Sequence, residues 1–132
     1  LSPPMFEQVV IEPTRKLVNK LRDRGVTVPI IGFPRAGGFM LKDYVESIDV
    51  QCVGLSTEVS PEYVSQHLPR GFPVQGQLDP LALIAGGDRL DQEVDRIIEA
   101  YKGRPHIFNL GHGVRPETPI AHVEQVVRRI KG

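Results

Sequence analysis

The chain has 132 residues, of which 40% are hydrophobic and 24% are charged, a balance typical of a globular protein rather than of a disordered one. Its 16 Lys and Arg residues equal its 16 Asp and Glu residues in number, so no bulk positive field favours nucleic acid or an anionic membrane, and an anion must be held by a local cluster. Cys52 is the single cysteine, which excludes an intramolecular disulfide and a four-cysteine or Cys₂His₂ zinc site and fits a reducing cytoplasm.

Four short β-rich segments are predicted strands, and helical patterns lie before, between and after them. The strands are expected at residues 28–32, 50–55, 72–76 and 106–110. Two segments carry apolar residues at helical spacing. The first comprises Leu90, Val94, Ile97, Ile98 and Tyr101, and the second comprises Ile120, Val123, Val126, Val127 and Ile130. Both stripes predict amphipathic helices with one buried face.

Proline and glycine mark the expected helix ends. A capping oxygen stands directly before a proline at Ser2-Pro3, Ser60-Pro61, Asp79-Pro80 and Thr118-Pro119, which predicts four helix starts. Three glycines fall where helices are expected to stop in a left-handed cap, namely Gly25, Gly71 and Gly103. The predicted order is therefore one helix followed by four strand and helix units.

The spacing of the strands indicates the fold class. Their starts at 28, 50, 72 and 106 lie 22, 22 and 34 residues apart, as βα repeats require, so the sheet is predicted to be parallel. Such a pattern fits an open doubly wound sheet or half of an eight-fold barrel. All four strand exits are rich in glycine and polar residues, which favours the barrel. We therefore predict an α/β fold in which residues 1–132 form one unit, half of a (β/α)8 TIM barrel.

Polar residues at the strand exits form the candidate site. His112 lies between Gly111 and Gly113 directly after the last strand, where a barrel places catalytic or binding groups. The alternative is a loop histidine that bonds a nearby carbonyl. Asn109 and Gln75 are predicted to line the same pocket, although Gln75 is equally well explained as a structural bridge inside the barrel.

Other polar residues at the exits have strong structural alternatives. Arg35 is a candidate anion clamp or a solvated loop arginine. Gln77 and Asp79 are further candidates for the pocket, but Asp79 before Pro80 is more simply a helix N-cap. Ser56 has no base at a readable spacing and is not predicted to be a nucleophile. Because HExxH, GxGxxG and Walker motifs are missing, neither a metal nor a nucleotide cofactor is predicted.

Three motifs, in this order along the chain, resemble segments of the uroporphyrinogen decarboxylase family. They are Ile31-Gly32-Phe33-Pro34-Arg35, then Val74-Gln75-Gly76-Gln77-Leu78-Asp79-Pro80, then Asn109-Leu110-Gly111-His112-Gly113 followed by Pro116-Glu117-Thr118-Pro119. The last motif, which contains the histidine, is the most specific. The resemblance covers essentially the whole chain and implies that residues 1–132 are the C-terminal half of a (β/α)8 barrel whose N-terminal half is absent.

The resemblance also implies a reaction. A carboxy-lyase of this family removes CO₂ from the four acetate side chains of uroporphyrinogen III, a tetrapyrrole of haem biosynthesis, and gives coproporphyrinogen III without a metal or organic cofactor. Of the family's substrate-contacting residues, His112 alone carries over, as a hydrogen-bond partner of a substrate carboxylate or an aid to proton delivery. The family's essential aspartate, arginine-rich loop and active-site tyrosine belong to the absent half. We therefore assign no catalytic residue and expect this chain alone to be inactive.

The chain departs from the family's usual sequence at two positions, and two other functions are alternatives to this interpretation. Ser56 stands where the family usually has an aspartate, and Gln77 stands where it usually has an asparagine. One alternative is a zinc-dependent corrinoid methyltransferase of the same superfamily, which needs a His and Cys zinc site that the lone Cys52 does not supply. The other is a non-catalytic half-barrel that serves as an assembly module.

Expectations for partners and location follow from the same patterns. No apolar run approaches the roughly 18 residues that span a bilayer, and the net charge of zero gives no positive field for nucleic acid. Neither a membrane nor nucleic acid is therefore an expected partner. The single cysteine fits a cytoplasmic protein, and the resemblance implies a homodimer at full length. A half-barrel is expected to leave two unpaired sheet edges and an exposed apolar inner face, and hence to associate or be poorly stable.

Overall fold

The computed structural model describes residues 1–132, and its four strands form one parallel sheet in which the spatial order equals the chain order. β1 (Ile31–Gly32) pairs with β2 (Cys52–Gly54), and β2 pairs with β3 (Val74–Leu78). β4 (His106–Leu110) extends the sheet beside β3 over five residue pairs. Every connection between neighbouring strands is a crossover, as a parallel sheet requires.

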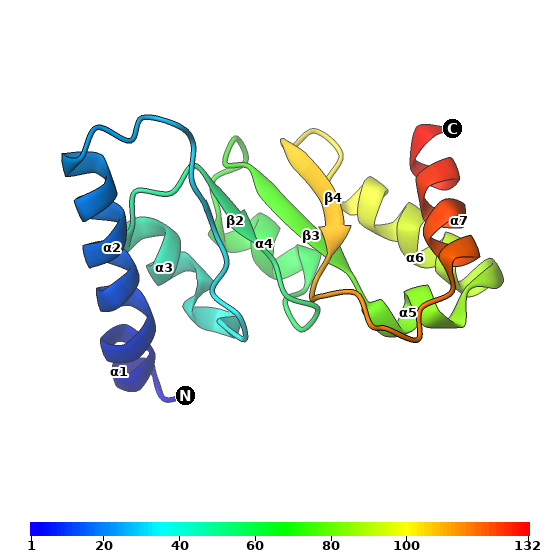
Figure 1. The fold of residues 1–132 in the computed structure, drawn as a ribbon, viewed down its shortest axis with the longest axis horizontal. Coiled ribbons are helices and arrows are strands. Elements are labelled where there is room, and N and C mark those ends of the chain that lie inside the picture. The colour runs from blue at the N-terminus through cyan, green and yellow to red at the C-terminus, as the bar shows by residue number, and fades with distance from the viewer.

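Helices precede, separate and follow the strands, and the helices between the strands cover one side of the sheet (Figure 1). The first helical segment comprises α1 (Pro3–Phe6), a π-helical stretch (Glu7–Ile11) and α2 (Glu12–Asp23). A short 3₁₀ turn (Gly38–Met40) leads into α3 (Leu41–Ser47), and α4 (Pro61–His67) follows β2. The remaining helices are α5 (Pro80–Ala85), α6 (Gly87–Ala100) and α7 (Ile120–Lys131).

The strands were predicted in the right places, but three of them have different bounds. β4 spans the predicted residues 106–110, whereas β1 begins at Ile31 instead of residue 28. Pro29 has no N–H to donate to a ladder, and the N–H of Ile30 donates to the side chain of Gln51 at 3.0 Å. β3 likewise starts after Pro73 and continues to Leu78. β1 and β3 therefore start later than predicted. Each begins after a proline, and before β1 the Gln51 side chain takes the place of a backbone acceptor.

Two of the four predicted N-caps are confirmed. The Ser60 hydroxyl accepts the backbone N–H three residues on at 3.1 Å, and the Asp79 carboxylate accepts the N–H two residues on at 2.8 Å. The helix start at Ser2-Pro3 is confirmed in position only, because Ser2 is the N-cap residue of α1 but its side chain makes no capping hydrogen bond. The prediction at Thr118 is wrong, because α7 begins one residue late and Pro119 occupies its N-cap position. Thr118 lies outside that helix, and its buried hydroxyl has no partner.

The predicted helix stops are confirmed at two of three glycines. Gly25 has φ of 84° and Gly103 has φ of 78°, so both adopt the left-handed conformation that glycine favours. Gly71 does not have a positive φ. α4 ends earlier, where Leu68 turns to extended backbone with φ of −106°, so no left-handed cap is needed there.

The core lies between the sheet and the helices. Its largest fully buried side chains are Ile11, Leu41, Leu55, Leu78, Leu90, Ile97, Val53, Val64, Val74 and Val94. The predicted stripe of α6 is confirmed apart from Ile98, which is 40% exposed. The predicted stripe of α7 is buried only at Val126, and its other four apolar members are 40–78% exposed. Most of the apolar face of α7 is therefore not covered by other residues of the chain.

Two arginines hold the backbone at the amino-terminal ends of the strands. Arg22 donates to the carbonyls of Val26 and Val28 at 3.0 and 2.9 Å and pairs with the Asp49 carboxylate at 2.7 Å. Arg104 donates to three carbonyls that precede β3, at distances of 2.7 to 3.1 Å. Each guanidinium thus holds several loop carbonyls together through its N–H donors.

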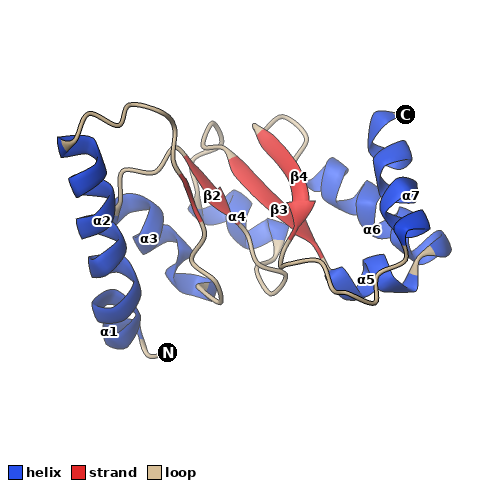
Figure 2. Ribbon diagram, viewed as in Figure 1, coloured by secondary structure: helices blue, strands red, loops and turns tan.

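The sheet order and the one-sided helices select the barrel over the open sheet. A doubly wound sheet reverses its strand order and carries helices on both faces, but here the order is sequential and α3, α4 and α6 lie behind the strands (Figure 2). The opposite face is uncovered, and Ile31, Phe33 and Ile107 are 46–48% exposed. This is the arrangement of four consecutive βα units of a barrel. No helix in it combines the length and apolarity needed to cross a bilayer.

Candidate functional site

A pocket of about 550 Å³ lies on the uncovered face of the sheet, at the exits of the strands. All four strands or their exits contribute to it. Its lining residues are Ile31, Phe33, Gly54, Leu55, Gln75, Asn109, Leu110, His112, Gly113 and Val114. The sheet therefore brings together three of the four residues predicted to form the site, which are Gln75, Asn109 and His112.

His112 is the second residue after β4 and is exposed to solvent. The backbone N–H of Gly113 donates to its Nδ1 atom at 2.8 Å. A neutral imidazole carries one proton, and a nitrogen that accepts a hydrogen bond cannot hold it. The proton of neutral His112 therefore lies on Nε2, which makes this atom a hydrogen-bond donor that is free for a ligand.

Two side-chain amides accompany the imidazole. Gln75 stands in register with Gly54 on one neighbouring strand and with Ile107 on the other. Asn109 accepts the backbone N–H of Leu110 at 2.8 Å through its Oδ1 atom, so its NH₂ group remains available as a donor. The lining contains no Asp, Glu, Lys or Arg. His112 is thus the one side chain of this pocket that can carry a positive charge.

Arg35 is not among the residues that line this pocket. It lies in the exposed loop after β1 and forms no ion pair within the chain. The sequence placed it beside a strand exit, but its side chain is exposed and does not line the pocket at that exit. The geometry therefore matches a solvated loop arginine within these residues.

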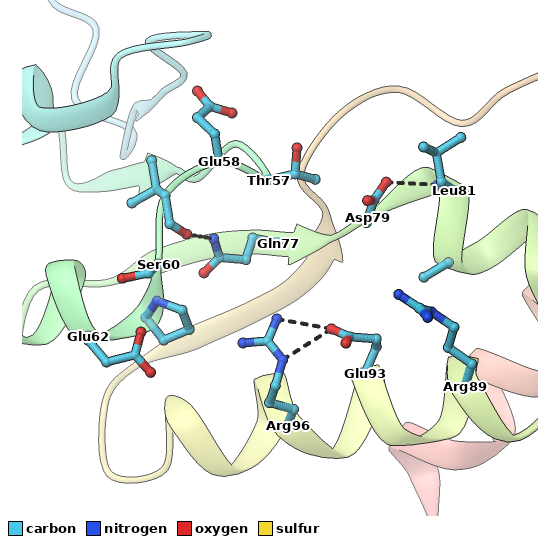
Figure 3. Close-up of a pocket in the computed structure, with 13 residues that line it drawn as sticks. Thr57, Glu58, Ser60, Glu62, Gln77, Asp79, Leu81, Arg89, Glu93 and Arg96 are labelled. Atoms are coloured by element: carbon cyan, nitrogen blue, oxygen red, sulfur yellow. Dashed lines mark hydrogen bonds and ion pairs between the residues drawn. The ribbon is translucent and has the colours of Figure 1, made fainter.

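Gln77 and Asp79 line a different pocket, on the helix side of the sheet (Figure 3). α6 supplies Arg89, Glu93 and Arg96 to this second pocket, and Arg96 donates to Glu93 at 2.9 and 3.1 Å. Asp79 is engaged as the N-cap of α5. The structure therefore separates these two residues from the group around His112.

Ser56 and Gln77, the two departures from the family pattern, contact each other. The Gln77 Nε2 atom donates to the carbonyl of Ser56 at 3.2 Å and to the carbonyl of Val59. The Tyr101 hydroxyl donates to the Gln77 Oε1 atom. Ser56 is buried, and its hydroxyl donates to the Glu58 carboxylate at 2.7 Å, a contact that the sequence did not predict. Sequence analysis placed Tyr101 only in the core and missed its hydroxyl contact.

His106 lies half-buried behind the sheet, where its ring packs at 4.7 Å from Tyr101 and its Nε2 atom lies 2.6 Å from the carbonyl of Gly76. Burial lowers the pKa of His106 below its ordinary value of 6.5, although the Gly76 carbonyl opposes this effect. The unfolded chain therefore takes up the proton more readily than the folded chain does. The neutral ring contributes stability above pH 6.5, and this contribution is lost as the pH falls toward the lower folded pKa.

Replacing His106 with Gln is expected to make the free energy of unfolding depend less on pH below pH 6.5. The glutamine amide keeps a donor for Gly76 but has no proton to gain in this pH range. The measurement is the free energy of unfolding in urea, above and below pH 6.5, for the wild type and the variant. His67→Gln is the matched control, because His67 is exposed. If the free energy of unfolding fell equally at acid pH in His106→Gln and in the wild type, the assignment of this pH dependence to His106 would be contradicted.

No group of three or more His, Cys, Asp or Glu side chains in the chain could hold a metal ion. Cys52 is buried in β2, and burial raises the pKa of its thiol, so the thiolate that zinc requires is disfavoured. The residues present therefore do not fit the zinc site that the methyltransferase alternative needs.

Comparison with known proteins gives one consistent result. The family model described as Uroporphyrinogen decarboxylase (URO-D) matches residues 1–132. A uroporphyrinogen decarboxylase from Hyphomonas neptunium is 63% identical over 127 residues, which are 96% of this chain and 37% of that protein. Those from Maricaulis maris and Sphingopyxis alaskensis are 50% and 49% identical, over 99% and 100% of this chain and 38% and 39% of their own lengths. The chain thus spans less than two-fifths of these curated relatives.

Proposed function

The chain belongs to the uroporphyrinogen decarboxylase family, and we propose that the protein of which it is a part removes the four acetate carboxyl groups of uroporphyrinogen III to give coproporphyrinogen III. The observation that carries this proposal is the 63% identity, over 96% of the chain, to a relative of that name. The site supports it with a hydrogen-bond donor at the last strand exit, where a carboxylate of the substrate can bind.

Residues 1–132 are, in this proposal, the C-terminal half of a (β/α)8 barrel. The sequential parallel order of β1 to β4 supports this assignment, because each βα unit of a barrel adds the next strand to the ring. β1 and β4 each pair with one neighbour only, and the exposed apolar face of α7 borders β4. The remaining units of the longer protein would cover these surfaces.

The chemistry requires an electron sink beside each acetate group. Protonation of a pyrrole carbon makes the ring cationic, the bond between the methylene and the carboxyl group then breaks, and its electron pair flows into the ring as CO₂ leaves. A proton added to the methylene then makes the methyl group, and loss of the ring proton that was added first restores the neutral pyrrole. His112 binds a substrate carboxylate through its Nε2–H, and Gln75 and Asn109 offer amide donors beside it. No metal or organic cofactor enters this scheme.

The charges of the substrate explain why the chain alone is expected to be inactive. Uroporphyrinogen carries eight carboxylates, whereas the pocket lining holds one side chain that can become cationic. Burying carboxylates without cationic or hydrogen-bonding partners is strongly unfavourable. In this proposal, the additional cationic groups and the group that protonates the pyrrole come from residues outside 1–132.

The test is a decarboxylation assay with uroporphyrinogen, run beside an intact-mass measurement of the same sample. A mass well above 14.7 kDa together with coproporphyrinogen formation is the expected result. A sample of that larger mass without turnover would refute the proposed activity. Turnover by residues 1–132 alone would instead show that no group from outside this chain is needed.

The assembly and location of the longer protein are part of the same proposal. We take it to be a cytoplasmic homodimer, as the family resemblance implies. Light scattering on the full-length protein is expected to give twice the chain mass. A monomer at assay concentration would overturn this part of the proposal without affecting the proposed reaction.

A further inference from the structure

We propose that Gln77 is a positioning residue that sets the location of His112 through the loop between β2 and α4. This inference rests on the proposed function, because it concerns the residue that binds the substrate carboxylate. Gln77 reaches neither the pocket around His112 nor the substrate, since it lies on the helix side of the sheet. Its effect must therefore pass through the backbone that it contacts.

The Gln77 amide is held in one orientation. Gln77 is 5% exposed, and Tyr101, which follows α6, is 2% exposed and donates its hydroxyl proton to the Oε1 atom. Burial raises the pKa of Tyr101, so its hydroxyl remains a donor. Because Oε1 is occupied in this way, the NH₂ group must face the opposite direction. Figure 3 shows the amide directed at the loop that carries Thr57, Glu58 and Ser60.

The NH₂ group binds both ends of the tight turn that follows β2. It donates to the carbonyl of Ser56 at 3.2 Å and to the carbonyl of Val59. The turn also closes on itself, because the Val59 N–H donates to the Ser56 carbonyl at 3.2 Å. One buried side chain thus fixes where this turn stands relative to β3. Asparagine, the residue that the family usually has at this position, is shorter by one methylene. In this chain, where Ser56 replaces the family's usual aspartate in the turn, asparagine cannot reach both carbonyls from the β3 backbone.

This turn also fixes the backbone of Gly111, the residue that precedes His112. A Cβ atom added to Gly111 would lie 2.7 Å from the Thr57 nitrogen and 2.8 Å from its Cγ2 atom, so the two backbones are in direct contact. The Gly111 N–H also donates to the carbonyl of Leu78 at 2.8 Å. Gly111 is therefore held between the end of β3 and the turn. His112 is the next residue, and its direction depends on this contact.

The experiment is a double-mutant cycle in the full-length enzyme with Gln77→Asn, His112→Asn and the double variant. Gln77→Asn is expected to lower kcat/KM by about 10- to 100-fold, the cost of a misplacement on the scale of 1 Å. In the His112→Asn background the same change is expected to have little further effect, because a residue that acts through His112 is not additive with it. Independent, additive effects would overturn the inference.

Gln125→Asn is the matched control for lost packing and lost hydrogen bonds. The Gln125 amide donates to the carbonyl of Gly87 at 2.9 Å and to Asp91 at 2.8 Å, so its loss weakens the contact of α7 with α6, away from the strand exits. This variant is expected to lose stability while kcat/KM stays unchanged. A loss of kcat/KM equal to that of Gln77→Asn would assign the Gln77 effect to stability alone.

A measurement without substrate separates this inference from the proposed function. The Gly113 N–H, which donates to the His112 Nδ1 atom, is expected to change its NMR chemical shift in Gln77→Asn and to keep it in Gln125→Asn. An unchanged shift in Gln77→Asn would overturn the positioning role. If the wild type proved inactive on uroporphyrinogen, the proposed function would fall, while this shift would still decide whether Gln77 positions His112.

Discussion

Replacing His112 with Asn in the full-length protein is expected to lower kcat/KM for uroporphyrinogen by about 10- to 100-fold, the loss of one hydrogen bond to a charged group. His112→Gln is expected to retain much more activity. The Gly113 N–H occupies Nδ1 and leaves Nε2 as the donor to the substrate. A glutamine amide places an N–H near the position of Nε2, whereas the shorter asparagine amide cannot reach it. Steady-state decarboxylation kinetics on both variants measure the difference.

The residue next to His112 provides the control for this tautomer assignment. Gly113→Ala keeps the N–H, and an added Cβ atom meets nothing within 4 Å, so this variant is expected to behave like the wild type. Gly113→Pro removes the N–H and is expected to lower kcat/KM, because Nδ1 loses its partner. Equal activity of His112→Asn and His112→Gln would contradict the role given to Nε2.

Ile97→Ala is expected to destabilise the protein by about 2 to 4 kcal/mol, as deletion of a fully buried aliphatic side chain does. Ile97 is 1% exposed and packs in the core between α6 and the sheet. Its neighbour Ile98 has the same chemistry but is 40% exposed. Ile98→Ala is therefore expected to cost less than about 1 kcal/mol. Urea unfolding of the two variants gives the comparison, and equal losses would contradict the assignment of the buried face.

The sequence was a good guide wherever a residue's chemistry acts locally. The parallel sheet followed from the spacing of the βα units, and Ser60 and Asp79 are N-caps because their side chains reach an N–H only two or three residues away. Thr118 shows the limit of this local reasoning. It has the same pattern of a capping residue before proline, but α7 starts one residue later, because how this helix meets α5 and α6 is decided by tertiary packing.

The candidate site shows the same division. His112, Asn109 and Gln75 come together because parallel strands deliver their exits to one end of the sheet. Gln77 is two residues beyond Gln75 and would share its face in a regular strand, yet its side chain lies on the helix side. Glycine at position 76 with φ of 136° interrupts the alternation, and no periodicity rule reveals such a break. The contact of Gln77 with Tyr101 was unpredictable for the same reason.

The two arginine clamps, Arg22 and Arg104, act at the end of the sheet opposite to the pocket. They hold the loops that precede the strands rather than the loops that follow them. Selection can therefore alter the exit loops, including the one that carries His112, without loosening the connections that hold the strands in register. A chain built this way can exchange its substrate-facing residues while its scaffold stays the same, which gives the fold room to diverge in specificity.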